Sequence, residues 1–400
     1  MATVPDTRSR WLRRSLVPEA GSRLGGTRWS WLESSVLRDL DPLLVSATVL
    51  ISGLSLLMIY SATRERLAAE GVDELYFVKR QGAAIAVGVV LMGLILGVDY
   101  RKLRDSYVLA YGATVVLLVA VLSPIGSSSR GSQAWFDFPG GFQLQPSELA
   151  KFGIVVALAG YATAHRGEMN SWRVTKTIAL AAIPLVLVML QPDFGTAMVL
   201  GLIVIALLAV AGASVRHLVV LALLAVSFIV AIVNVGMLKE YQVDRLTSFV
   251  TQDHDKRSTT YNTEQSKIAI ENGGFDGQGF GNGSQTAGGF VPEQHTDFIF
   301  TAVGEEFGFL GGATLLGLFA IVMWRTWRAA TVARDRFGTL VCVGVLAMFA
   351  FQIFENIGMT MGIMPVTGIP LPFMSYGGSS TITAFACIAL VANVSMRRFR

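Results

Sequence analysis

The sequence predicts an all-α polytopic membrane protein with about ten transmembrane helices. Hydrophobic residues make up 52% of the 400 positions, charged residues only 15%, and the mean hydropathy is +0.55. This composition lies outside the range of soluble globular domains. The apolar residues also fall into long runs, and roughly 18 to 20 such residues are enough to cross the hydrocarbon core of a bilayer as a helix.

Ten apolar runs follow one another along the chain, and the fourth and fifth are shorter than a full span. The expected spans are residues 43–62, 81–98, 107–124, 149–164, 177–190, 194–213, 218–238, 298–324, 337–364 and 373–394. Residues 1–42 are Arg-rich and lack an apolar core followed by a cleavage site. They are therefore expected to form a cytoplasmic tail and not a signal peptide.

Lys and Arg residues predict the orientation in the membrane. With the N-terminus inside, the inner segments hold 21 of the 32 basic residues, as the positive-inside rule requires. An even number of spans places both termini in the cytoplasm, with a membrane domain at 43–396 and a short C-terminus at 397–400. The net charge of +4 follows from this bias, so the sequence gives no support for nucleic-acid binding. Cys342 and Cys387 both lie within spans and predict no disulfide or metal framework.

A large extracellular loop is expected at residues 239–296, between the seventh and eighth spans. Its 58 residues far exceed the usual connection length, which indicates a functional loop. Residues 273–289 contain eight glycines among seventeen residues. Glycine permits close approach of the backbone to a ligand, but also simple flexibility, and the composition alone favours a flexible loop.

A second outer segment, residues 131–152, is too polar and too rich in Gly and Pro to cross the membrane. It is expected at the outer interface with Trp135 at headgroup depth. It leads into a helix that Ser147 is expected to cap, and Glu148 and Lys151 share one face of that helix. An exposed pair there would contribute little to stability. Lys151 is followed by apolar residues, however, and ionisable groups at membrane depth usually face a cavity or partner, which favours a functional role.

Two further outer segments are QPDFG at 191–195 and MPVTGIPLPFMSYGGSS at 364–380. Asp193 is expected to cap the sixth helix. The second segment cannot be regular helix, and irregular backbone at membrane depth must be surrounded by protein or a wet cavity. The helix start at Ser379 and Ser380 can either cap that helix or face an anion.

The stretch VPEQHTDFIF at 291–300 joins the large loop to the eighth span. Thr296 or Asp297 can cap that span, and a carboxylate there is favourable to the helix dipole. An acid on the outer face can instead act as a general base. From the pattern alone, capping is the simpler interpretation. Three carboxylates lie within spans, and each is expected to meet a polar partner or water: Glu305, Glu306 and Glu355.

The motifs QPSELAK, QPDFG, RLTSF, HTDFIF, GEEFG and PVTGIPLPFMSYGGSS, in this order on ten spans, resemble the SEDS family (shape, elongation, division and sporulation). This family consists of membrane-embedded peptidoglycan polymerases, and the resemblance covers residues 40–396. PVTGIPLPF and HTDFIF are closer to the elongation member RodA than to the division member FtsW. The sequence departs from the family at GSQAW, where a basic residue is expected before the Trp.

The resemblance implies a peptidoglycan glycosyltransferase of the bacterial cytoplasmic membrane that supports cell elongation and rod shape. Its substrate would be lipid II, a disaccharide-pentapeptide on undecaprenyl diphosphate, polymerised into β-1,4-linked glycan outside the membrane. The family's essential loop acid falls on Asp297, and the Glu and Lys of its fourth helix fall on Glu148 and Lys151. The implied partners are a class B penicillin-binding protein, which cross-links the strands, other elongation-complex membrane proteins, and the lipid bilayer.

The implied chemistry suits these residue types. One carboxylate, Asp297, suffices as the base that deprotonates the acceptor 4-hydroxyl. Glycosidases use a second carboxyl group to protonate a poor leaving group. Diphosphate is already a good leaving group, so here positive charge, hydroxyls or a metal is expected to stabilise the departing anion instead. No cofactor is certain from sequence, and a divalent cation such as Mg²⁺ is one candidate. The side chains expected to bind substrate are Glu148, Lys151, Arg245, Ser379 and Ser380. An α-linked donor and a β-linked product indicate one displacement with inversion.

Two other function classes fit parts of the pattern. A lipid-linked precursor flippase or secondary transporter would also have about ten spans, broken helices and intramembrane charges. Transport predicts charges near the bilayer midplane in two repeated halves, whereas the informative residues here gather on the outer side. A structural scaffold for cell-wall proteins would not need Asp297.

Overall fold

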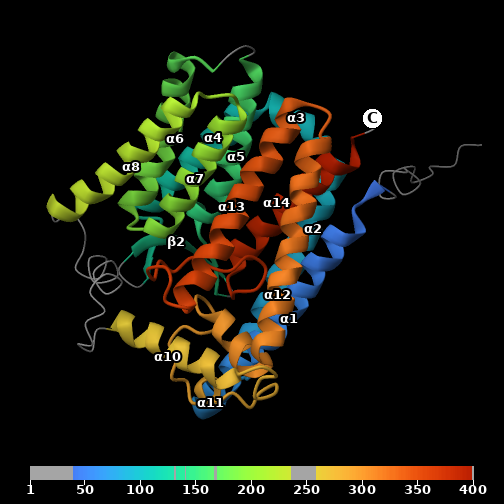
Figure 1. Cartoon of the computed structure of the whole chain (residues 1–400), viewed down its shortest axis with the longest axis vertical. Helices are drawn as coiled ribbons and strands as arrows, with labels where there is room; N and C mark the ends of the chain where they lie inside the picture. The colour runs from blue at the N-terminus through green and yellow to red at the C-terminus, as the bar shows by residue number, and fades with distance from the viewer. Residues whose placement is uncertain (1–38, 130–131, 140, 166–168, 236–257, 399–400) are drawn as a thin grey trace, which may run out of the picture.

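The computed structural model describes residues 39–129, 132–139, 141–165, 169–235 and 258–398. Within these ranges the chain forms a bundle of long helices with a small sheet. The helices α10 (Ser258–Gly273) and α11 (Ser284–Ala287) form a cap at one end of the bundle (Figure 1). Residues 1–38 of the predicted cytoplasmic tail (1–42) and the candidate Arg245 lie outside the described residues.

Each predicted span coincides with a helix. The ten helices are α1 (Pro42–Ala69), α2 (Tyr76–Gly97), α4 (Tyr107–Leu122), α5 (Pro146–Ala164), α6 (Ser171–Leu190), α7 (Phe194–Val210), α8 (Val215–Val235), α12 (Ile299–Val332), α13 (Arg336–Thr360) and α14 (Gly378–Met396). Six described helices are long and apolar enough to cross a membrane, and three shorter apolar helices accompany them. The polytopic helical class is therefore confirmed, while the count of ten spans stays a prediction.

Short acidic or amide side chains fix where several helices begin. Asp41 Oδ1 accepts hydrogen bonds from the backbone N–H groups of Leu43 and Leu44, and Pro42 occupies the first turn, where its missing N–H is harmless. The same kind of cap is found at the starts of α6, α7 and α13, from Asn170, Asp193 and Asp335. The expectation that Asp193 caps the sixth span is confirmed.

The centre of the bundle is formed by α5 and α14, which are buried along almost their whole length. Glycines allow neighbouring helices to approach α5 closely. A Cβ at Gly153 would lie 1.9 Å from the hydroxyl of Thr114 in α4, and a Cβ at Gly344 in α13 would lie 2.9 Å from Val155. Small residues at such contacts let helix backbones pack tightly in membranes. With 19 residues, α5 is longer than the predicted fourth span.

The start of α5 differs from the sequence expectation. Pro146 is the first helical residue, Gln145 precedes it without a side-chain cap, and Ser147 lies inside the first turn. The Ser147 hydroxyl donates to Asp193 Oδ2 at 3.0 Å. The predicted Ser147 cap is therefore wrong, because proline takes the first helical position and leaves the serine free to link α5 to the start of α7.

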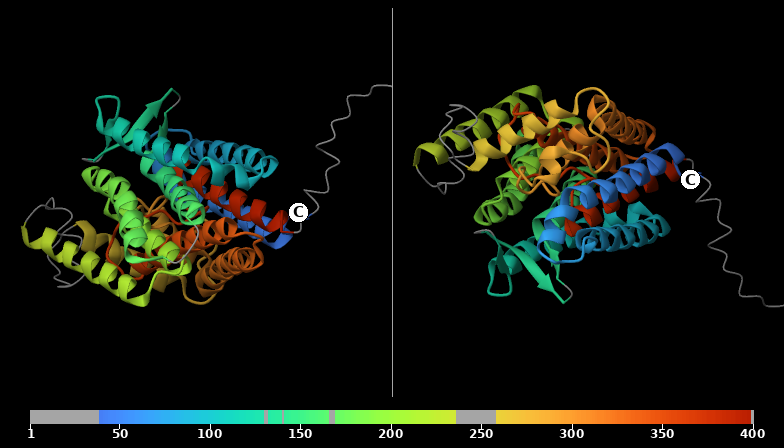
Figure 2. Two further views of the ribbon diagram at one scale, coloured as in Figure 1. Left: turned by 90° about the horizontal axis from the view of Figure 1, so that it is seen from above. Right: turned by 90° about the horizontal axis from the view of Figure 1, so that it is seen from below.

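The segment before α5 contains a sheet that the all-α prediction did not include. Its antiparallel strands are β1 (Ser127–Ser129), β2 (Ser132–Phe138) and β3 (Phe142–Leu144), in the order β1-β2-β3. Trp135 pairs with Ser127, and Phe136 with Leu144. Figure 2 shows β2 standing at the side of the bundle. The polar, Gly-broken sequence was correctly excluded from spanning, and its alternating aromatic residues form strands.

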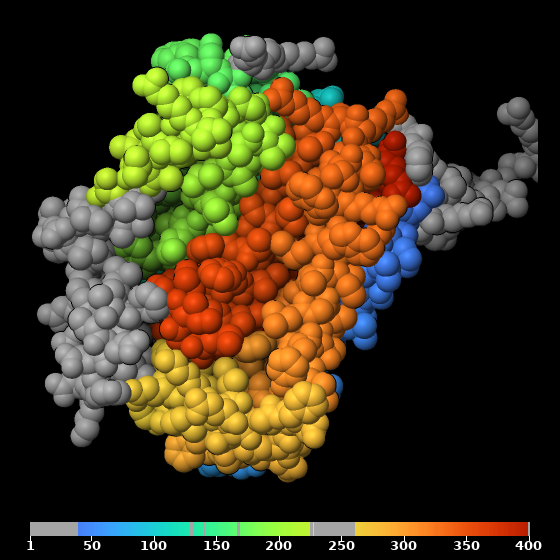
Figure 3. Space-filling model, in the orientation of Figure 1, coloured from blue at the N-terminus to red at the C-terminus, as the bar shows by residue number. Residues whose placement is uncertain are grey.

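The Gly-rich segment is ordered and packs against a break in α12. Its residues 274–283 lie between α10 (Ser258–Gly273) and α11 (Ser284–Ala287), which form the cap at the lower end of Figures 1 and 3. At Gly308 the α12 backbone leaves the helix, with φ of 60°. Four backbone hydrogen bonds of 2.9 to 3.2 Å join residues 274–279 to residues 305–310 there. The composition-based preference for a flexible loop is therefore wrong for this part.

The three carboxylates within predicted spans all have polar partners, as expected. Glu305 accepts hydrogen bonds from the backbone N–H groups of Gln285 and Thr286 at 2.7 and 2.9 Å, which fastens α11 to α12. Glu306 accepts from Ser61 of α1. Glu355 accepts from the Thr367 hydroxyl at 2.8 Å.

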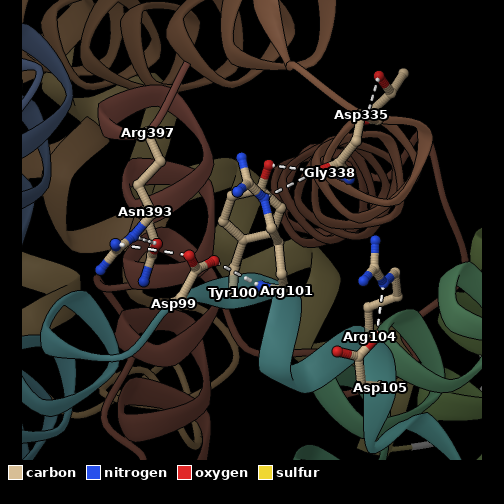
Figure 4. Close-up of polar contacts among 10 residues, drawn as sticks. Asp99, Tyr100, Arg101, Arg104, Asp105, Asp335, Gly338, Asn393 and Arg397 are labelled. Carbon is tan, nitrogen blue, oxygen red and sulfur yellow. Dashed lines mark hydrogen bonds and ion pairs between the residues drawn. The ribbon is translucent and has the colours of Figure 1, made fainter. Parts of the chain in front are cut away.

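At the opposite end of the bundle, charged groups tie the helix ends together (Figure 4). The Tyr100 hydroxyl, in α3 (Tyr100–Asp105), donates to Asp335 Oδ2 at 2.7 Å, and Asp335 Oδ1 accepts from the Gly338 N–H. Arg397 lies 3.9 Å from Asp99. The start of α1 and the end of α14 lie at this same end (Figures 1 and 2).

Tyr100 makes this end of the bundle sensitive to alkaline pH. Burial and the Asp335 carboxylate raise the pKa of Tyr100 to about 12 from its ordinary 10.0. The neutral phenol is thus favoured in the folded state. Its contribution to stability is complete below pH 10 and is lost as the pH rises to about 12. Tyr100→Phe is expected to remove this part of the alkaline loss and, by deleting one hydrogen bond, to lower stability at pH 7 by about 1 kcal/mol.

The measurement is thermal unfolding of the purified protein in detergent between pH 7 and pH 12. Tyr60→Phe, which removes a surface hydrogen bond to Glu74, serves as the matched control. Identical alkaline curves for wild type and Tyr100→Phe would contradict the role given to Tyr100.

Candidate functional site

One large cavity of about 1420 Å³ opens among the helices near the sheet. Most of its wall is apolar and comes from α6, α7 and α8. The lining residues there include Ile178, Leu185, Met198, Leu202, Ile205, Leu221 and Leu224. We call this part the apolar trough. The cavity exceeds the about 300–1,000 Å³ of typical small-molecule pockets and is large enough for a lipid chain.

The other part of the cavity is polar, and we call it the polar mouth. Its side chains come from separate segments that meet here: Arg80, Trp135, Asp193, Glu293, His295 and Tyr376. The backbone at Gly377 and Gly378, which leads into α14, completes this wall. The mouth therefore unites four of the outer segments that the sequence singled out.

Asp193 is held firmly in the mouth. Its Oδ2 accepts from Ser147 and from Gln145 Nε2, at 3.0 and 3.2 Å, and its Oδ1 accepts from the Thr196 N–H at 2.9 Å. These donors offset the negative charge and join the starts of α5 and α7. Asp193 thus serves the structure as a cap and as a link between two helices.

The segment at 293–297 is fixed through its backbone. The Tyr376 N–H donates to the carbonyl of His295 at 2.9 Å. The buried Asn356 amide donates to the carbonyls of Asp297 and Ile369, each at 2.8 Å. Asn356 therefore clamps the approach to α12 against the loop that follows α13.

Asp297 is half-buried and directly follows Thr296, which lines the cavity. Its neighbours Glu293, His295 and Thr296 line the polar mouth, while Asp297 is not among the described lining residues. The residue that precedes α12 as its cap is Phe298, which has no side-chain cap hydrogen bond. The interpretation of Thr296 or Asp297 as the N-cap residue is therefore wrong by one or two positions, because the chain turns once more before the helix begins.

Glu148 and Lys151 form a buried ion pair, as their spacing predicted. Lys151 Nζ lies 2.6 Å from Glu148 Oε1, and the two residues are 1% and 4% exposed. They line a second, small cavity of about 10 Å³ together with Gln352, Ser380 and Thr383. Neither residue is among the described residues that line the large cavity. Their contact with substrate stays a prediction.

The small cavity has room for about one water molecule. The Thr383 hydroxyl is buried there, without a hydrogen-bond partner among the described residues. Removing one member of a buried ion pair leaves the other charge uncompensated, which is strongly destabilising. The pair therefore has at least a structural role, because loss of either partner would leave a charge buried where α5 meets α13 and α14.

The two serines at the start of α14 are in different surroundings. The Ser379 hydroxyl accepts from the Gln145 N–H at 2.9 Å and donates to the Gln143 carbonyl at 3.1 Å. It thus fastens α14 to the link between β3 and α5. Ser380 borders the small cavity with Lys151. Of the candidate substrate-binding residues, the structure brings together Glu148, Lys151 and Ser380.

Sequence reasoning missed the basic residue of the polar mouth. Arg80 directly precedes the predicted second span and belongs to none of the motifs. A basic residue at an outer end runs against the positive-inside bias, and that exception was the available signal. His295 and Tyr376 lay within motifs but had no assigned role. Asn356 acts from inside α13, where a single buried amide gives no pattern.

No group of three or more His, Cys, Asp or Glu side chains in the described ranges comes together as a metal site. Mg²⁺ is usually held by one or two carboxylates together with substrate phosphates, so this finding does not bear on an ion that enters with substrate. The divalent cation therefore stays a prediction.

The chain matches known proteins along almost its whole length. The model of the Cell cycle protein family of FtsW, RodA and SpoVE matches residues 42–399. The chain belongs to this family. Stage V sporulation protein E of Bacillus subtilis is 37% identical over 358 residues, which cover 89% of this chain and 96% of that protein. Peptidoglycan glycosyltransferase MrdB of Escherichia coli is 32% identical, covering 90% and 94%.

Solved structures agree with this membership. A chain from the structure of a peptidoglycan synthase complex that coordinates polymerization and crosslinking matches with a TM-score of 0.76 at 31% identity, covering 90% of this chain and 99% of that chain. Rod shape determining protein RodA of Thermus thermophilus matches with a TM-score of 0.67 at 30% identity, covering 90% and 98%. The SEDS resemblance is confirmed. Relatives named FtsW and MrdB have similar identities, so the closer likeness to the elongation branch stays a prediction.

Asn356 provides a direct test of the clamp at Asp297. Asn356→Asp replaces the donor amide by a carboxylate next to two carbonyl oxygens. We expect a loss of about 1–3 kcal/mol, because both carbonyls lose their buried donor. Hydrogen–deuterium exchange measured by mass spectrometry should rise in peptides covering residues 293–297. Asn272→Asp on the surface is the matched control, and unchanged exchange in Asn356→Asp would show that the clamp does not hold this segment.

Proposed function

We propose that this chain is a peptidoglycan glycosyltransferase that polymerises lipid II into β-1,4-linked glycan. The observation that carries the proposal is the family match over residues 42–399, to relatives named for this activity. The cavity supports it, because an apolar trough continuous with a polar mouth suits an isoprenoid chain attached to a polar headgroup. Asp297, which directly follows the lining residues His295 and Thr296, is the candidate general base.

In the proposed reaction the Asp297 carboxylate takes the proton of the acceptor 4-hydroxyl as its oxygen attacks the anomeric carbon of the donor. The bond between that carbon and the diphosphate oxygen breaks, and its electron pair leaves with the lipid diphosphate. One glycosidic bond forms, and the configuration inverts in this single displacement. A well-positioned base typically contributes about 10²–10⁴-fold to the rate. The clamp by Asn356 would supply that positioning.

We place the polar mouth and the cap of α10 and α11 outside the cytoplasmic membrane, and both chain ends inside. The cluster of basic residues at the opposite end of the bundle supports this orientation. It contains Arg101, Lys102 and Arg104 of α3, and Arg397. In this proposal a class B penicillin-binding protein is the partner that cross-links the strands, and the enzyme acts in the elongation complex.

The test is polymerisation of labelled lipid II by the purified protein with its partner. Asp297→Asn keeps the size of the side chain but removes the base, so we expect at least a hundredfold loss of glycan, in line with the about 10²–10⁴-fold value of general-base catalysis. Asp276→Asn, an exposed acid in the Gly-rich segment, is the matched control and should keep wild-type activity.

Both variants are first compared by thermal unfolding, so that loss of activity is not mistaken for loss of fold. Normal glycan from Asp297→Asn would sink the proposed mechanism. Transbilayer movement of lipid II in vesicles, with no polymer formed, would instead support the alternative of a lipid-linked precursor flippase. Assays with and without Mg²⁺ decide the metal requirement.

A further inference from the structure

We propose that Arg80 is the phosphate-binding residue of the large cavity and holds the diphosphate of an isoprenoid-linked substrate. This inference rests on the proposed function, because it names the group that receives the leaving diphosphate at the same site. Arg80 lies near the start of α2, is half-buried and lines the polar mouth.

The Arg80 guanidinium is held in place by its surroundings. Its Cζ lies 4.3 Å from the centre of the Tyr76 ring, which is a favourable cation–π geometry. Its side chain hydrogen-bonds to Tyr376, the residue whose backbone anchors His295. A guanidinium fixed in this way loses little freedom when a ligand arrives, and such preorganisation favours binding.

The turn between β2 and β3 leaves space for this guanidinium because it contains a glycine. A Cβ at Gly141 would lie 2.1 Å from Arg80 Nη2. Any side chain there would therefore displace the charged group. Gly141 also has φ of +72°, so an L-residue would be strained as well. The sheet thus forms one wall of a fitted position for Arg80.

Arg80 is one of two Lys or Arg residues among the described residues that line the cavity, and the carboxylates of Asp193 and Glu293 line the same mouth. Arg66 is the other Lys or Arg among the described lining residues, and it is 3.6 Å from Glu70 with more than half of its side chain exposed. The ammonium of Lys151 is buried against Glu148 in the small cavity. The nearby Asp193 carboxylate already accepts hydrogen bonds from three donors.

The shape of the cavity selects the class of anion. A guanidinium has five N–H donors in a planar fork, so it can bond Tyr376 and a phosphate together. From this point the cavity continues into the apolar trough between α6, α7 and α8. The ligand that fits both parts is a phosphate or diphosphate ester of a long apolar chain. Arg80 would also stabilise the charge that grows on the diphosphate as the glycosyl bond breaks.

The experiment measures binding without any sugar, so it does not depend on polymerisation. Purified protein in phosphatidylcholine nanodiscs is titrated with geranylgeranyl diphosphate, geranylgeraniol, inorganic diphosphate and phosphatidylglycerol, and binding is followed by native mass spectrometry. We expect wild type to bind geranylgeranyl diphosphate about ten- to a hundredfold more tightly than the alcohol, as charge-assisted hydrogen bonds would give. Inorganic diphosphate and phosphatidylglycerol should bind more weakly than the isoprenoid diphosphate.

Arg80→Gln is expected to remove the preference for the diphosphate over the alcohol, and Arg80→Lys to keep part of it, since Lys retains the charge but not the planar fork. Lys79→Gln is the matched control, because Lys79 is the adjacent residue, is exposed, and pairs with Asp73 at 2.5 Å. Gly141→Ala keeps Arg80 but displaces its guanidinium, so it should also weaken diphosphate binding if Arg80→Gln proves unstable.

An unchanged diphosphate preference in either Arg80→Gln or Gly141→Ala overturns the proposal. Equal binding of phosphatidylglycerol and geranylgeranyl diphosphate also overturns it, since the cavity would then hold an ordinary bilayer lipid. Arg80-dependent binding in a protein that makes no glycan would leave this inference standing and sink the proposed function alone. If Arg80→Gln still makes glycan and binds the diphosphate as wild type does, the inference on Arg80 is wrong and the proposed function stands.

Discussion

Backbone polar groups that leave regular helix at membrane depth must find partners within the protein, and the region around the large cavity is built around that requirement. Asn356 satisfies the carbonyls of Asp297 and Ile369, and the Tyr376 N–H satisfies that of His295. Ser379 does the same for the link between β3 and α5. Because each irregular segment completes the hydrogen bonds of another, they can meet around one cavity.

The same arrangement separates two kinds of charge. Glu148 and Lys151 are almost fully buried, and their opposite charges form an ion pair with each other. Arg80, Asp193 and Glu293 instead line a cavity that reaches into an apolar trough. The first turn of α14 stands between the two environments, with Gly377 and Gly378 facing the large cavity and Ser380 the small one. Glu148 offsets the charge of Lys151, and neither residue is among the described residues that line the large cavity.

Hydropathy alone predicted the ten apolar helices, because a membrane span needs a continuous apolar run that few other features imitate, but it did not predict the polar helix α10. The helix caps at Asp41 of α1 and Asp193 of α7 can also be predicted from sequence, because an Asp directly before an apolar run is a common capping residue. The clamp by Asn356 could not, since it joins residues 59 positions apart through one amide. The contacts of Arg80 with Gly141 and Tyr376 join residues that are far apart in the sequence, so no local pattern predicts them. The Gly-rich segment packs against the break in α12 at Gly308, and composition does not reveal this partner.

At the break at Gly308, the Gly-rich segment supplies the backbone hydrogen bonds that a further turn of helix would otherwise supply. The N–H groups of Phe309 and Leu310 bond the carbonyls of Gly274 and Phe275, and the carbonyls of Glu305 and Glu306 accept from residues 278 and 279. Segment and helix therefore share one hydrogen-bond ladder and should open as one cooperative unit. A deletion within residues 274–279 would strip four backbone groups of α12 of their partners at once. The length of this stretch is fixed by helix geometry, although its sequence resembles that of a linker.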